Sequence, residues 1–192
     1  MNHRAAPEIG TAMSIGAVHE VLRAAHFAAR RHAGQRRKGA AAEPYVNHLL
    51  EVAELVCSAL DELDANLVIA ALLHDTVEDA GVTKEELVQA FGADVAELVV
   101  EMTDDKSLPA PERKRLQVVT ASKKSVRAQV IKLADKISNV RSVLFSPPAG
   151  WSVQRKREYF EWAKQVVHGL TRPNPKLKAE FDRLCEQARS LG

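Results

Sequence analysis

Apolar residues recur at helical spacing along most of the chain. Leu49, Val52 and Val56, for example, follow one another at intervals of three or four residues, as on one face of an amphipathic helix. The same period predicts helices over residues 17–34, 47–60, 65–79, 91–103, 111–122, 125–144, 151–170 and 175–191. A capping box formed by Thr83 and Glu86 predicts a further short helix. No alternating strand pattern occurs, so we expect an all-α fold in a single domain.

One apolar run, LVIAALL at 67–73, leads directly into a cluster of polar side chains. It is shorter than the roughly 20 residues that cross a bilayer, so it predicts a buried helix that ends near Gly81. The last turns of that helix would hold His74, Asp75, Glu78 and Asp79. Carboxylates are disfavoured there because a helix C-terminus carries partial negative charge and burial penalises unpaired charge. This conflict indicates a functional site, although a solvated polar turn would explain the same residues.

A second polar stripe lies on the predicted helix over residues 125–144. It consists of Lys132, Asp135, Asn139 and Ser142, at intervals of three or four residues. Asp135 lies in the most apolar part of the segment and needs a cation there, either a metal ion or a neighbouring lysine, Lys132 or Lys136. His48 begins another amphipathic helix, where a lone histidine is more often structural.

Four of these side chains form a coherent set of metal ligands if their helices converge. The set is His48, His74, Asp75 and Asp135. Nitrogen and oxygen donors without thiolate suit Mn²⁺, Fe²⁺ or Co²⁺ better than a structural zinc ion. No histidine occurs between residues 75 and 135, so we expect one ion, which would acidify water and polarise a phosphoryl oxygen. Glu78 and Asp79, one turn beyond the ligands, would orient or deprotonate that water.

Composition narrows the class of protein. Of 192 residues, 46% are hydrophobic and 27% charged, as in a soluble globular domain. A net charge of +2 without a basic stripe argues against nucleic-acid binding. Because no signal segment or membrane-spanning run occurs, and Cys57 and Cys185 are interpreted as reduced packing residues, we expect a cytoplasmic protein that binds no membrane. Residues 1–16 lack periodicity and are expected to form a flexible tail before a domain over residues 17–192.

Several strings of the sequence resemble a known enzyme family. An isolated His-Asp pair with a distant histidine and a distant aspartate resembles the HD phosphohydrolase superfamily. Longer strings resemble the hydrolase domain of RelA/SpoT-type alarmone enzymes. They are HAGQRRK, PYVNHLLEVAELV, AALLHDTVEDAGVT, FGADVAELVVEMTDDKSL, ERKRLQ, IKLADKISNVR and GWSVQRKREYFEWAKQVVHGL. The likeness runs from about residue 20 to about residue 170 and is strongest to stand-alone small alarmone hydrolases of the metazoan SpoT-homologue type.

The resemblance implies an HD-domain helical bundle that binds one Mn²⁺ ion per chain. Its ligands would be His48, His74, Asp75 and Asp135. Glu78 and Asp79 would activate the attacking water, with Asn139 beside them. The implied reaction removes the 3′-pyrophosphate from guanosine 3′,5′-bis(diphosphate) (ppGpp), or from its pentaphosphate relative (pppGpp), and leaves GDP or GTP. Alternatives are an NADPH 2′-phosphatase, another nucleotide phosphohydrolase, and a catalytically idle nucleotide sensor, against which the intact acidic pair argues.

Basic and aromatic side chains are expected to contact this substrate. Arg37 and Lys38 would neutralise a polyanion near the metal, although without the resemblance a solvated basic loop is the simpler interpretation. Trp151, Arg155 and Tyr159 recur every four residues and would share one helix face. Spacing alone favours a core edge there, whereas the resemblance favours the substrate pocket.

Two further residues, Lys106 and Ser142, complete the expected substrate contacts. The ERKR string at 112–115 is expected to be a solvated helix face. The expected partner is a small-molecule nucleotide. The sequence is also compatible with a homodimer.

Overall fold

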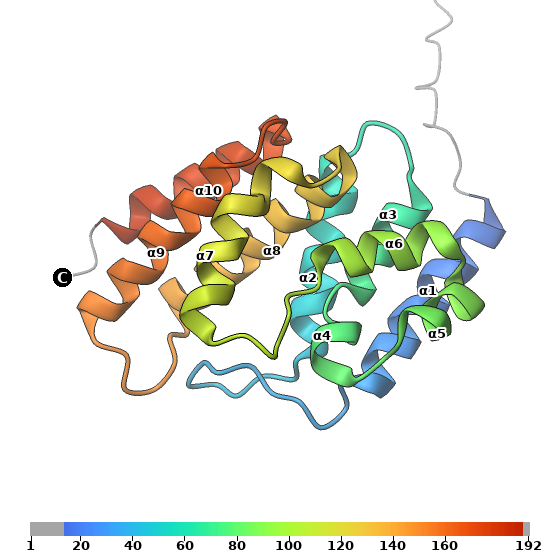
Figure 1. The fold of residues 1–192 in the computed structure, drawn as a ribbon, viewed down its shortest axis with the longest axis horizontal. Coiled ribbons are helices and arrows are strands. Elements are labelled where there is room, and N and C mark those ends of the chain that lie inside the picture. The colour runs from blue at the N-terminus through green and yellow to red at the C-terminus, as the bar shows by residue number, and fades with distance from the viewer. Residues whose placement is uncertain (1–13, 190–192) are drawn as a thin grey trace, which may run out of the picture.

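The computed structural model describes residues 14–189, which fold into helices without strands (Figure 1). The helices are α1 (Ile15–Arg31), α2 (Val46–Ala59), α3 (Ala65–Leu73), α4 (Thr76–Ala80), α5 (Lys84–Phe91), α6 (Ala93–Met102), α7 (Ala110–Thr120), the 3₁₀ turn η1 (Ala121–Lys123), α8 (Val126–Phe145), α9 (Val153–His168) and α10 (Pro175–Ala188). The expected all-α fold is therefore confirmed.

Two buried helices organise the molecule. The apolar α3 packs against α1, α2 and α6, and each residue of 67–73 is buried. The long α8 packs against α2, α9 and α10, so α2 contacts both groups of helices. In Figure 1, α7–α10 lie on one side and α1, α3, α5 and α6 on the other. No helix within residues 14–189 is both long and apolar enough to cross a membrane.

The prediction of a single helix over residues 65–79 is wrong, because the helix is interrupted at His74 and Asp75 and divides into α3 and α4. His74 Nδ1 donates to Ala71 O at 2.8 Å, and Thr76 Oγ1 donates to Leu73 O at 2.6 Å, so side chains bond carbonyls at the end of α3. The acidic residues thus lie at the start of α4, where the helix dipole no longer opposes them. Gly81 ends α4 with φ of 67°, as expected.

Three smaller expectations also change. Helix α1 begins at Ile15 and is capped by Ser14, so residues 14–16 belong to the helix and its cap, while the rest of the expected tail lies outside the described residues. Trp151 precedes α9, which begins at Val153, so it does not share a helix face with Arg155 and Tyr159. Cys57 is exposed and is not a packing residue, whereas Cys185 is buried.

The basic loop between α1 and α2 is held against the loop that follows α8. Isolated bridges join Arg36 to Pro44 and Gly39 to Pro148. A Cβ atom at Gly39 would lie 2.4 Å from the carbonyl oxygen of Ser146, so only glycine allows this approach. The contact fixes the position of the loop that carries Arg37 and Lys38.

Candidate metal centre and active site

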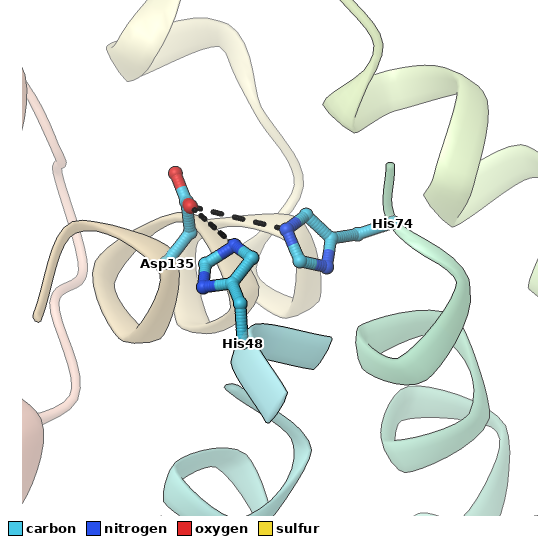
Figure 2. A group of neighbouring side chains, drawn as sticks. All are labelled: His48, His74 and Asp135. Carbon is cyan, nitrogen blue, oxygen red and sulfur yellow. Dashed lines mark ion pairs between the residues drawn. The ribbon is translucent and has the colours of Figure 1, made fainter. Parts of the chain in front are cut away.

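The side chains of His48, His74 and Asp135 converge where α2, the end of α3 and α8 meet (Figure 2). One ligand atom from each lies within 4.8 Å of the other two, and all three residues are buried. Asp135 Oδ1 is 3.4 Å from His48 Nε2 and 3.8 Å from His74 Nε2. These three residues could therefore hold a metal ion.

Hydrogen bonds turn the Nε2 atom of both imidazoles toward this point. His74 uses Nδ1 to donate to a backbone carbonyl. His48 Nδ1 lies 2.8 Å from Ser138 Oγ, whose own proton is donated to Glu51 Oε2 at 2.5 Å, so Ser138 accepts from His48. Both Nε2 atoms are buried without a hydrogen-bond partner among the described residues. Buried ring nitrogens that are oriented in this way fit metal ligation.

Asp75 lies beside this group. Its Oδ2 is 3.2 Å from His74 Nε2 and 3.6 Å from His48 Nε2. It accepts a 2.6 Å hydrogen bond from the Tyr45 hydroxyl, whose pKa is raised by burial and by Asp75 itself, so the phenol remains a donor. Burial lowers the pKa of His74, but Asp75 and Asp135 outweigh it and raise the pKa to about 10. The carboxylates therefore favour a cation at the centre.

The acidic pair of α4 lies next to the candidate ligands. Glu78 Oε2 accepts from the backbone N–H of Asp104 at 3.1 Å, and Oε1 is 3.7 Å from Arg113. Burial raises the pKa of Glu78; the hydrogen bond from the Asp104 backbone opposes this, while nearby carboxylates add to it. Asp79 accepts from Gln35 at 3.1 Å and from Lys106. Glu78 is therefore a stronger base than an ordinary glutamate.

Two cavities that share lining residues open over these groups. The first, of about 300 Å³, is lined by His74, Asp75, Glu78 and Asp135 among others. The second, of about 510 Å³, is lined by Arg37, Ser142, Trp151, Arg155 and Tyr159 among others. Both are lined by Lys38, Tyr45, Asp79 and Asn139. Together they make one site, with the candidate ligands in the first cavity and Arg37, Trp151 and Arg155 in the second.

Asn139 connects the two parts. Its Nδ2 donates to Asp135 Oδ1 at 2.5 Å, and its Oδ1 accepts from Arg37 at 3.1 Å. An amide so placed holds the candidate ligand and the basic loop in one arrangement.

The aromatic residues expected to bind substrate do meet, although Trp151 lies outside the helix. The Arg155 guanidinium lies 4.7 Å from the centre of the Trp151 ring, and the Trp151 and Tyr159 rings are 5.7 Å apart. Lys106 differs from the other expected contacts, because it bonds Asp79 and does not line either cavity.

Sequence reasoning left several residues of the site unassigned, namely Gln35, Tyr45, Glu51, Arg113 and Ser138. Tyr45 lies three residues before His48, which offered a local signal; the others lie far along the chain from their partners. The expectation of a fully solvated ERKR face is wrong at Arg113, which is half-buried and pairs with Glu78. Lys136, and not Lys132, pairs with Asp135, at 3.0 Å.

Comparison with known proteins identifies the class. The model of the HD domain family matches residues 24–160, and the chain belongs to this family. Among curated relatives, "Guanosine-3′,5′-bis(diphosphate) 3′-pyrophosphohydrolase MESH1" of Homo sapiens is 48% identical over 168 residues, which cover 88% of this chain and 94% of that protein. The Drosophila melanogaster protein of the same name is 45% identical over 161 residues, covering 84% and 90%.

A solved structure described as a metazoan ortholog of SpoT that hydrolyzes ppGpp matches with a TM-score of 0.86 and 42% identity. The match covers 95% of this chain and 100% of that one. The expected HD-domain fold and the resemblance to small alarmone hydrolases are confirmed.

Proposed function

We propose that this chain is a metal-dependent ppGpp 3′-pyrophosphohydrolase, which releases pyrophosphate from ppGpp or pppGpp and leaves GDP or GTP. The observation that carries the proposal is the pair of buried imidazole Nε2 atoms that face Asp135 and accept or donate no hydrogen bond among the described residues, beside the acidic pair of α4. The relatives named as ppGpp pyrophosphohydrolases, which match nearly all of this chain, support the choice of substrate.

The proposed cofactor is one Mn²⁺ ion per chain. Its ligands would be His48, His74, Asp75 and Asp135, whose mixed nitrogen and oxygen donors suit this class of metal. When bound, such an ion supplies Lewis-acid polarisation of a phosphoryl oxygen and acidifies water.

The residues of the acidic pair have different tasks in the proposed reaction. Glu78, with its raised pKa, takes the proton of the attacking water, whose oxygen adds to the phosphorus next to the ribose 3′-oxygen. The bond from phosphorus to O3′ breaks and its electron pair goes to O3′, which takes up a proton from solvent to become the 3′-hydroxyl. Pyrophosphate departs, and Glu78 returns its proton to solvent. Asp79, held by Gln35 and Lys106, orients the water, and Asn139 lies beside it.

The second cavity would hold the nucleoside and the 5′-diphosphate. Arg37, Lys38 and Arg155 supply positive charge for the phosphates, with Ser142 in the same wall. Trp151 and Tyr159 supply flat surfaces for the base or ribose. The partner is thus a small nucleotide. We assign the enzyme to the cytoplasm, because free thiols such as those of Cys57 and Cys185 stay reduced there.

The test is a substrate panel. Purified protein with Mn²⁺ is given ppGpp, NADPH and GMP in turn, and pyrophosphate and orthophosphate are measured separately. We expect pyrophosphate and GDP from ppGpp, lost in His48→Ala and kept in the matched variant His26→Ala, whose side chain is exposed on α1. Orthophosphate from NADPH without pyrophosphate from ppGpp would instead identify an NADPH phosphatase.

A further inference from the structure

Lys132 is a buried cation that the proposed reaction does not yet use. It lies on α8 one turn before Asp135 and is only 4% exposed. Its side chain lines the first cavity together with His74, Glu78 and Asp135. The side chain is therefore almost fully covered by protein, and it lines the space where the scissile phosphates would lie.

Within residues 14–189, Lys132 has no hydrogen bond and no carboxylate within 4.0 Å. The nearby acceptors are already engaged: Asp135 with Lys136 and Asn139, Asp104 with Gln117, and Glu78 with the Asp104 backbone. Lys136, one turn further along α8, shows the contrast, because it pairs with Asp135 and lies 4.6 Å from the centre of the Trp162 ring.

An ammonium in this position is costly to the free protein. Burial lowers the pKa of Lys132 to about 8, with Lys136 adding to the effect and Asp135 opposing it. A buried charge without a partner destabilises a fold, and side chains that break this rule at a cavity are typical of ligand sites. An anion that enters the cavity could pair with this ammonium.

We propose that Lys132 binds the 3′-diphosphate of the substrate, donating hydrogen bonds to its non-bridging oxygens. This inference rests on the proposed function, because that reaction brings a diphosphate to the candidate metal ligands. The carboxylates that crowd the cavity would repel such a group, and Lys132 supplies local positive charge that lies deeper than Arg37 and Arg155 of the second cavity.

The experiment compares two ligands that differ by the 3′-diphosphate. Binding of ppGpp and of GDP to Mn²⁺-loaded protein is measured by calorimetry in a Glu78→Gln background, where slow turnover permits equilibrium. Adding Lys132→Met should weaken ppGpp binding about 10- to 100-fold, the usual worth of a charge-assisted hydrogen bond, and leave GDP binding unchanged. Lys123→Met, at an exposed position before α8, is the matched control and should change neither.

Thermal unfolding and metal content separate binding from a structural role. Because Lys132→Met removes an unpartnered buried charge, its melting temperature should equal or exceed that of the parent, with one Mn²⁺ still bound. Lys132→Gln provides a second neutral variant if methionine packs poorly, and Lys132→Arg should recover part of the ppGpp affinity.

Unchanged ppGpp affinity, equal loss of ppGpp and GDP affinity, or a fall in melting temperature with loss of metal would each overturn the inference. If the wild-type protein releases pyrophosphate from ppGpp while Lys132→Met binds it normally, only the role of Lys132 fails. If the wild-type protein neither binds nor hydrolyses ppGpp, the proposed function fails and Lys132 has no diphosphate to bind.

Discussion

The histidines His48 and His74 show how single hydrogen bonds orient the ring nitrogens of the candidate metal site. Each imidazole commits Nδ1 to an acceptor, and each Nε2 is buried without a hydrogen bond and faces the carboxylate of Asp135. The residue types that meet here could be predicted from the sequence, because two histidines and two aspartates lie in or beside apolar helical segments, where a buried carboxylate needs a cation. Ser138 and Glu51 could not, since they are 87 residues apart and meet only in the folded chain.

We expect Ser138→Ala to weaken Mn²⁺ binding about 10- to 100-fold, the usual effect of losing a group that orients a metal ligand. The alanine leaves His48 Nδ1 without the acceptor that fixes its tautomer. Calorimetric titration of Mn²⁺ measures the change, with the exposed Ser122→Ala as the matched control. Equal affinities in the two variants would show that His48 needs no support from Ser138.

Glu78→Gln should separate catalysis from metal binding. The amide cannot take a proton from water, so we expect kcat to fall about 100-fold or more, while metal content stays at one ion per chain. Glu85→Gln, exposed on α5, is the control and should have wild-type kcat. Loss of metal in Glu78→Gln would instead make Glu78 a ligand.

Arg155→Ala tests the wall of the second cavity. Arg155 would contact the substrate equally before and during the transition state, so its loss should raise KM for ppGpp about 10-fold and leave kcat nearly unchanged. The melting temperature should stay constant, because an exposed arginine contributes little to stability. Lys156→Ala, on the same helix but outside both cavities, is the control. An unchanged KM would remove Arg155 from the substrate site.

At the scale of elements, the break between α3 and α4 is the feature that periodicity could not predict. Apolar spacing continues through Val77, so the sequence indicates one helix over residues 65–79. The break depends on the side chains of His74 and Thr76, which donate hydrogen bonds to backbone carbonyls of α3. The spacing of apolar residues cannot predict such hydrogen bonds. The amphipathic helices α2 and α8 were predictable because burial of one face sets their period.

The contact between the basic loop and the loop after α8 gives a prediction at the same scale. Gly39→Ala would place a methyl group against the carbonyl of Ser146 and push the loop that carries Arg37 and Lys38 away from the cavity. We expect KM for ppGpp to rise about 10-fold through weakened charge-assisted contacts, with metal affinity unchanged.

Steady-state kinetics with Gly34→Ala as control checks this expectation, because a Cβ atom at Gly34 meets nothing within 4 Å. Similar KM values for the two alanine variants would mean that the loop position does not matter for binding.

At the scale of the whole molecule, the candidate metal site joins helices that are distant in sequence. His48 comes from α2, His74 follows α3 and Asp135 comes from α8. The network behind His48 reaches further, because Arg141 of α8 pairs with Glu51 of α2 and with Glu180 of α10. An ion bound here would stabilise most of the fold at once.

Mn²⁺ should therefore raise the free energy of unfolding. At a free concentration 100 times its Kd, an ion that binds only the folded state adds about 2.7 kcal/mol. Thermal or urea unfolding with and without Mn²⁺ measures this gain, which should vanish in His48→Ala and persist in His26→Ala. A gain of similar size in His48→Ala would place the stabilising ion elsewhere.

The two cysteines differ in exposure, so their rates of reaction with a thiol reagent can report local opening of the fold. Cys57 is open to solvent on α2, whereas Cys185 is buried on α10 and burial raises the pKa of its thiol, so it reacts slowly. A thiol reagent should therefore label each native chain once, at Cys57. A second label would appear only when α10 detaches or the chain unfolds. The labelling rate of Cys185 therefore measures how often α10 opens. Arg141 links this helix to the hydrogen-bond network behind His48. The measurement needs no mutation and can be made with any metal ion or nucleotide present.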